Sequence, residues 1–210
     1  MNEHVAPKGF QVSQSRPLQC ERRRFTADEV LAMEEVGILD PEENVELIDG
    51  EIITMAAKTP RHEDMRTELC EFFANHQPRD FKAAQEPAFY LSDHWEPEPD
   101  ILLFSRRMKV SDVRGPDALL VVEVAVSSLS IDLKIKAPMY AAHGVREYWV
   151  VDAKRLVTHV HSEPGPDGYA SIRQLAATDR LEPLLLPTLA LTLADLGFEP
   201  LADDEDAQGT

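Results

Sequence analysis

The residues of this chain that could do chemistry begin with a glutamate inside an apolar segment. Glu123 interrupts residues 119–125, which are otherwise Leu, Val and Ala. An ionised carboxylate in a core strand costs free energy unless it pairs with a cation or binds a metal. A salt bridge to a nearby Lys or Arg would explain Glu123 as well as a metal would. The residue therefore indicates either a buried ion pair or a metal ligand.

A second carboxylate stands in a similar position. Asp100 follows the sequence Glu-Pro-Glu-Pro and opens the apolar run 101–104. An Asp after Pro is also typical of a turn or of a strand cap. Strands that follow each other in sequence are often neighbours in a sheet, so Asp100 and Glu123 are expected to converge. Two converging carboxylates predict a hard oxygen site suited to Mg²⁺ or Mn²⁺.

A lysine completes the candidate group. Asp132, Lys136 and Tyr140 recur every four residues, so on a helix they share one face. A solvated Asp–Lys pair on a helix surface is the alternative, and it would contribute little to stability. If the helix packs over the strand that carries Glu123, Lys136 can reach a phosphate. Its charge would then stabilise a phosphodiester in the transition state.

The elements that must position these residues follow from apolar periodicity, caps and turn signals. The Thr26–Glu29 capping-box pattern predicts the first helix, and Asp49-Gly50 predicts a hairpin. Helices flanking a mixed sheet with one central buried strand make an α/β or α+β fold. The predicted helices are 27–35, 60–76 and 132–143, the last capped by Asp132 and kinked or shifted by Pro138. The predicted strands are 45–48, 51–55, 81–90, 100–104, 118–126, 145–151, 156–161 and 169–175, with an extended segment at 184–193.

The charge of the chain restricts its partners. Twenty-one basic against thirty-eight acidic residues give a net charge of −17, and residues 25–198 alone carry −15. Such a protein repels a polyanion at long range, which argues against non-specific coating of DNA. Any approach to nucleic acid would need a divalent metal, a local basic strip or a partner. The sequence predicts no membrane span and no secretory signal, and its two cysteines fit a reduced cytoplasm.

The predicted organisation is a single folded domain with two polar ends. We expect a flexible N-terminal arm at residues 1–24, which ends in Arg22, Arg23 and Arg24. Solubility alone is the alternative role of this basic cluster. Residues 25–198 form the folded domain. Residues 199–210 read as an acidic disordered tail.

The order Asp, then Glu in an apolar strand, then Lys resembles the PD-(D/E)XK nuclease superfamily. More narrowly, the segment 123–152 is similar to the Uma-type restriction endonucleases. The residues that carry this likeness run from Glu123 to Asp132, followed by Lys136, Tyr140, Gly144 and 147–152. The hairpin 46–52, His62 and the closing segment 186–191 fit it too. The resemblance covers roughly residues 25–197 and implies a restriction endonuclease-like fold.

The resemblance also implies roles for single residues. Asp100 and Glu123 would hold Mg²⁺ or Mn²⁺, with the backbone carbonyl of Val124 as a further ligand. Lys136 would take the lysine role, relocated to the following helix, because Ala125 occupies the usual lysine position. Glu46 and His62 are secondary candidates, since a Glu before a hairpin is often solvated and a single helical His is often structural.

The function implied is a Mg²⁺-dependent endonuclease that hydrolyses DNA phosphodiester bonds. A non-catalytic interaction module on the same fold is the rival, favoured by the acidic domain and by Ala125. A hydrolase acting on another phosphoester also stays open. A homodimer is compatible with double-strand cutting, but the sequence carries no clear oligomer signal.

Overall fold

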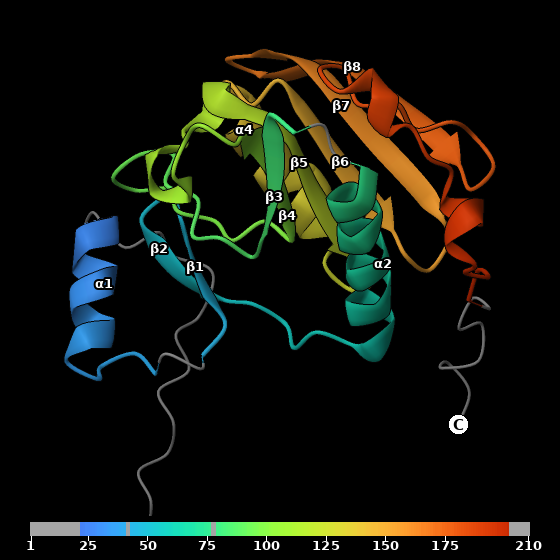
Figure 1. Ribbon diagram of the computed structural model, residues 1–210. Coiled ribbons are helices and arrows are strands. Elements are labelled where there is room, and N and C mark those ends of the chain that lie inside the picture. Colours follow the sequence, from blue (N-terminus) through green and yellow to red (C-terminus); the bar gives the residue numbers. More distant parts are fainter. Residues whose placement is uncertain (1–21, 41–42, 77–78, 202–210) are drawn as a thin grey trace, which may run out of the picture.

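The structure is a computed structural model that describes residues 22–40, 43–76 and 79–201 (Figure 1). Most of the predicted N-terminal arm and nearly all of the predicted acidic tail lie outside the described residues. The last three residues of the arm are described, and they contact the folded domain. Arg22 pairs with Glu51, and the Arg24 side chain donates to the backbone carbonyl of Asp49.

A mixed β-sheet forms the centre of the described chain. Its strand order is β3-β4-β5-β6-β7-β8, and only β5 and β6 pair in parallel. The strong apolar run that predicted a central strand forms β5, which is buried on both faces. The predicted α/β (α+β) fold class is therefore confirmed. The strands are β3 (Phe81–Gln85), β4 (Ile101–Ser105), β5 (Ala118–Ala125), β6 (Glu147–Asp152), β7 (Val157–Gly165) and β8 (Gly168–Ala176).

The two faces of β5 pack against different helices. Leu120, Val122 and Val124 face α2 (Pro60–His76), whose Met65 and Phe73 belong to the same core cluster. Val121 and Ala125 belong to a second core cluster with Tyr140 of α4 (Ala137–Ala142). Because side chains alternate along a strand, Glu123 lies on the α4 face. Figure 1 shows α2 lying across one face of the sheet.

The predicted N-terminal hairpin and first helix also form. Strands β1 (Val45–Ile48) and β2 (Glu51–Thr54) meet at Asp49 and Gly50, which both have positive φ, as a tight hairpin turn requires. The helix α1 (Ala27–Glu35) starts at the capping box of Thr26 and Glu29. Leu47 packs on α1, and its backbone pairs with Glu96, just before β4. This pairing fixes the hairpin beside the start of β4.

The helical segment after β5 differs from its prediction. It begins at Leu129, and α3 (Leu129–Ile131) continues into a π-helical turn at Asp132–Lys136 and then into α4. Asp132 is therefore a buried residue inside the helix and not its N-cap. Pro138 lies in the first turn of α4, directly after the π-turn, where its missing N–H is tolerated. The expected kink thus becomes a change of helical pitch, and Gly144 follows the helix with a positive φ, which ends it.

Two further predictions were wrong. The strand predicted at 81–90 ends at Gln85, because Glu86 adopts a positive φ and Pro87 cannot donate to a ladder. The closing segment 184–193 is not extended. It forms the short 3₁₀ turns Pro187–Leu189 and Leu193–Leu196, and four of its leucines fill the core on the α2 face. These are Leu186, Leu189, Leu191 and Leu193. In the described part of the chain, no helix is long and apolar enough to cross a membrane.

Candidate functional site

Asp100 and Glu123 meet at one edge of the central sheet. The antiparallel pairing of β4 and β5 sets Ile101 opposite Val122, so Asp100 stands beside Glu123 and Val124. The backbone N–H of Val124 donates to Asp100 Oδ2 at 2.7 Å. The backbone N–H of Asp100 lies 3.4 Å from Glu123 Oε2. Both side chains are buried, so the sheet holds two carboxylates together away from bulk water.

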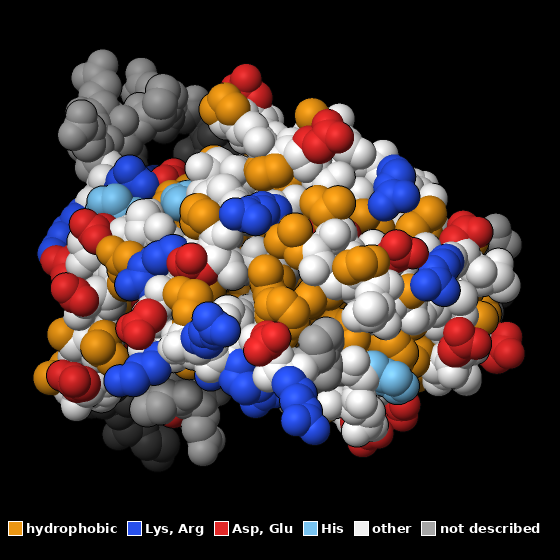
Figure 2. Space-filling view, turned by 45° about the horizontal axis from the view of Figure 1, so that its top comes forward, with side chains coloured by type: hydrophobic (Ala, Val, Ile, Leu, Met, Phe, Trp, Pro, Cys, Tyr) orange, Lys and Arg blue, Asp and Glu red, His pale blue; other side chains and the backbone are white. Residues whose placement is uncertain are grey.

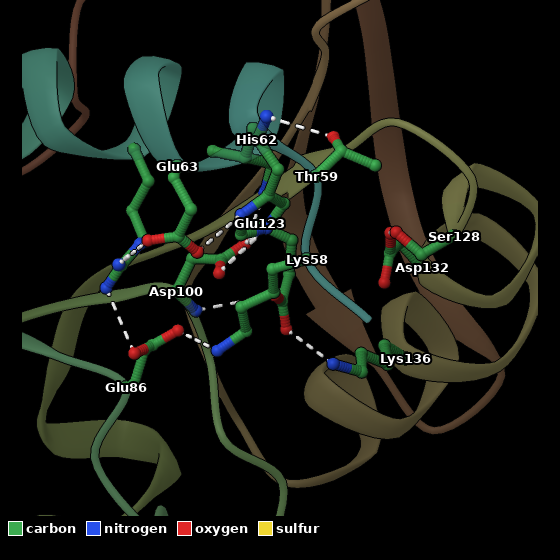
Figure 3. Close-up of polar contacts among 12 residues, drawn as sticks. Lys58, Thr59, His62, Glu63, Glu86, Asp100, Glu123, Ser128, Asp132 and Lys136 are labelled. Carbon is green, nitrogen blue, oxygen red and sulfur yellow. Dashed lines mark hydrogen bonds and ion pairs between the residues drawn. The ribbon is translucent and has the colours of Figure 1, made fainter. Parts of the chain in front are cut away.

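Lys136 approaches this pair from the π-turn. Its Nζ donates to Glu123 Oε1 at 2.9 Å and to Glu46 Oε1 of the hairpin at 2.8 Å. The Tyr140 hydroxyl, one turn further on, lies 3.3 Å from the same oxygen of Glu123. The predicted shared face of Lys136 and Tyr140 therefore points at Glu123. Figure 3 shows Lys136 entering from the side opposite α2.

His62 contacts the other carboxylate. It lies in the first turn of α2, and its Nε2 is 3.1 Å from Asp100 Oδ2. Its Nδ1 lies 3.4 Å from Glu63 Oε1. The structure thus brings together all five predicted side chains, although their roles stay predictions. The side chains are Asp100, Glu123, Lys136, Glu46 and His62.

The backbone carbonyl of Val124 faces the same edge. In an extended strand, the N–H and C=O of one residue point to the same side. The Val124 N–H points at Asp100, so its C=O does too, whereas the next carbonyl, of Ala125, accepts from Ala153 beside β6. The predicted backbone ligand is therefore oriented toward the carboxylate pair.

These residues line a cavity of about 60 Å³, which is room for an ion with a few water molecules. Among the further residues that line it are Asp132 and Ser128, which the sequence did not single out for the site. Asp132 is buried, and Ser128 donates to its Oδ2 at 2.6 Å. The four-residue spacing between Asp132 and Lys136 is a signal that both face the cavity. The prediction of Asp132 as a helix cap assigned it a different role.

The electrostatics of the cavity reflect an excess of acid. Burial raises the pKa of Glu123 well above its usual range, against the opposing charge of Lys136. Burial also raises the pKa of Asp132, to about 6. Burial alone would raise the pKa of Asp100, but hydrogen bonds from His62 and Val124 and the nearby charges lower it overall. Burial opposes the charge of Lys136 too, yet the surrounding carboxylates raise its pKa.

The donor set fits a divalent cation. Four buried carboxylates surround one buried ammonium, and Glu46 Oε2 has no hydrogen-bond partner. Across residues 22–40, 43–76 and 79–201, no three His, Cys, Asp or Glu side chains group closely enough to hold a metal. Mg²⁺ does not need such a cage, because it usually takes one or two carboxylates and keeps several waters. Asp100, Glu123 and the Val124 carbonyl match that requirement.

The fold and this arrangement define a restriction endonuclease-like α+β protein with a carboxylate pair at the sheet edge. The family described as "Uma2: Putative restriction endonuclease" matches residues 27–194, and the chain belongs to this family. The predicted resemblance is confirmed.

One solved structure supports the fold. A "putative nuclease belonging to DUF820" from Anabaena variabilis superposes with a TM-score of 0.66 at 18% identity, covering 82% of this chain and 97% of its own. The type IIG restriction endonuclease BpuSI has a TM-score of 0.38 at 11% identity, covering 56% of this chain and 14% of its own. No curated protein matches the chain.

Proposed function

We propose that this protein is a Mg²⁺-dependent endonuclease that hydrolyses DNA phosphodiester bonds, with Mn²⁺ as an alternative metal. The observation that carries the proposal is the buried pair of Asp100 and Glu123, with Lys136 on one oxygen of Glu123. Membership of a restriction endonuclease family supports it. The acid excess of the cavity also supports it, because a divalent cation would neutralise that excess.

Each residue has a distinct part in the proposed reaction. Asp100, Glu123 and the Val124 carbonyl would hold the metal, which as a Lewis acid would neutralise phosphate charge and make water a better nucleophile. His62 and the Val124 N–H orient the Asp100 carboxylate. Glu46 and Glu123 keep the Lys136 ammonium charged beside the cavity. The ammonium would stabilise the negative charge that develops on the phosphate.

The proposal is tested on plasmid DNA with purified wild-type protein and the Asp100→Asn and Glu123→Gln variants. We expect Mg²⁺- or Mn²⁺-dependent cleavage by the wild type and none by either variant. Calorimetric titration with Mn²⁺ measures the metal site directly, and Asp100→Asn should lose that binding. Equal cleavage by Glu123→Gln and the wild type would exclude this site.

A matched control separates loss of the site from loss of a buried charge. Glu147 is a buried glutamate on the neighbouring strand β6, outside the cavity lining. Glu147→Gln should leave Mn²⁺ binding unchanged. If it removes binding to the same extent as Asp100→Asn, the effect comes from folding and not from metal ligation.

One observation favours a non-catalytic interaction module on the same fold. Ala125 occupies the usual lysine position, and the relocated Lys136 is already engaged by Glu46 and Glu123. A protein of this kind would not bind Mn²⁺ and would not cleave DNA, so the calorimetric titration with Mn²⁺ decides between the two functions.

A further inference from the structure

We propose that Lys58 binds a phosphate of the substrate at the mouth of the cavity, and that Glu86 holds its ammonium in position until the substrate arrives. The inference rests on the proposed function, because the ligand is a nucleic-acid phosphodiester. It assigns a substrate-binding role to a residue in the loop between β2 and α2.

The need for such a residue comes from the charge of the molecule. With a net charge of −17, the protein repels a polyanion. On the face shown in Figure 2, basic and acidic side chains are interspersed, so this face presents no continuous basic surface. A phosphodiester that reaches the cavity therefore depends on cations close to it.

Lys58 is the accessible cation of the cavity. Of the described residues that line it, those with basic side chains are Lys58, His62 and Lys136. The side chain of Lys136 is only 3% exposed and is held by two carboxylates, and that of His62 is 11% exposed. The side chain of Lys58 is 33% exposed. A phosphate outside the cavity can meet Lys58 without any rearrangement of the buried residues.

Glu86 sets the place of the ammonium. Its Oε1 pairs with Lys58 Nζ, as Figure 3 shows, and its backbone N–H donates to the carbonyl of Asp100 at 3.2 Å. Glu86 adopts a φ of 45°, a conformation that few residues other than glycine take up. The backbone thus ties the partner of Lys58 directly to the residue that carries the candidate metal ligand.

The pair can open without leaving a buried charge behind. The second oxygen of Glu86 pairs with Arg66 at 3.0 Å, and Arg66 also pairs with Glu63. When Lys58 turns to a phosphate, Arg66 still compensates Glu86. Lys58 is therefore the exchangeable member of this network, whereas the Arg66 side chain is only 12% exposed.

The test compares the two partners of one ion pair. Binding of a fluorescent DNA duplex is measured by anisotropy with Ca²⁺ replacing Mg²⁺, over a range of salt concentrations. Lys58→Gln should raise the Kd about tenfold and reduce the slope of log K against log salt by about one. Glu86→Gln should lower the Kd, because it frees the ammonium and removes a repelling charge. If the pair is only structural, both variants weaken binding and the slope stays unchanged.

Controls keep this inference separate from the proposed function. Lys58→Arg keeps the charge and should keep the wild-type slope. Lys109→Gln removes an exposed lysine that does not line the cavity, and should have a smaller effect than Lys58→Gln. Equal Kd and slope for the Lys58→Gln and Lys109→Gln variants would overturn the role of Lys58 alone. A wild type that binds no duplex would overturn both proposals.

Discussion

Two buried glutamates on neighbouring strands of the same sheet have opposite surroundings. Glu147 opens β6, and N–H groups occupy both of its oxygens, from Trp149 Nε1 at 2.8 Å and from the Leu184 backbone at 2.6 Å. Glu123 on β5 instead contacts the Lys136 ammonium and the Tyr140 hydroxyl, and it lines a cavity with other carboxylates. Burial raises the pKa of both glutamates.

This difference separates a structural carboxylate from a candidate functional one. Glu147 joins the C-terminal segment to the sheet, and each of its carboxylate oxygens accepts one hydrogen bond. Glu123 shares one ammonium with Glu46, while Asp100 and Asp132 add further negative charge nearby. Burial and a raised pKa therefore do not identify a site. What distinguishes Glu123 as the candidate is the excess of acid around its cavity.

The largest expected effect is the loss of cleavage when Glu123, and not Glu147, loses its charge. Glu123→Gln should reduce Mg²⁺-dependent cleavage by at least about 10³-fold, an effect of about 4 kcal/mol on the activation free energy. Glu147→Gln should leave cleavage per folded molecule within about twofold of the wild type, less than about 0.5 kcal/mol. Single-turnover rates on one duplex, normalised to the folded fraction, measure both. Equal losses in the two variants would remove the distinction between these glutamates.

The second prediction concerns the shared ammonium. Lys136→Met leaves Glu46 and Glu123 buried without their cation, which should lower the free energy of unfolding by about 3–5 kcal/mol at pH 7. Urea denaturation measures the loss. Lys134→Met, two residues away on the exposed side of the same turn, is the matched control and should change stability by less than about 0.5 kcal/mol. A similar small change for Lys136→Met would mean that the carboxylates do not depend on this lysine.

Much of the fold could be predicted from the sequence because its elements carry local signals. The capping box predicts the start of α1, Asp49-Gly50 predicts the hairpin, and the apolar run with Glu123 predicts the central strand. The segment 184–193 could not be predicted in this way. Four of its leucines are buried against distant parts of the chain, and Pro187 interrupts strand pairing.

The site could be predicted only in part for the same reason. Asp100 and Glu123 lie on consecutive strands, so sequence order brings them together. Glu46 meets Lys136 across 90 residues, through the long-range pairing of Leu47 with Glu96, and no local pattern reports that contact. The cap predicted at Asp132 is wrong because the helix begins three residues earlier, at Leu129, and runs through a π-turn that a 3.6-residue period does not reveal.

A third prediction tests whether Glu147 stabilises the fold. In Glu147→Gln, one carboxylate oxygen becomes an NH₂ group that faces an N–H donor, so one hydrogen bond is lost in a buried place. The free energy of unfolding should fall by about 1–3 kcal/mol. Glu182→Gln removes an exposed carboxylate from its pair with Arg180 and should cost less than about 1 kcal/mol. Thermal unfolding compares the two, and an unchanged Tm for Glu147→Gln would contradict the role in stability.

A last expected effect is the pH dependence that comes from Asp132. Its pKa rises from 3.8 to about 6 in the folded protein, first because it is buried. The unfolded chain therefore releases this proton at lower pH than the folded chain. It follows that the contribution of Asp132 to stability falls as the pH rises from about 4 to about 6 and stays low above that range.

Asp132→Asn should remove this loss. We expect the variant to match the wild type near pH 4 and to exceed its free energy of unfolding by up to about 3 kcal/mol at pH 7, measured in EDTA by urea denaturation. Asp64→Asn, at an exposed position of α2, should follow the wild-type curve. A variant that is less stable than the wild type at pH 7 would show that the attraction between the Asp132 carboxylate and the Lys136 ammonium exceeds the free-energy cost of burying that carboxylate. Asp132 would then resemble Glu46 as a partner of the ammonium, and the excess of acid in the cavity would be smaller than its carboxylates imply.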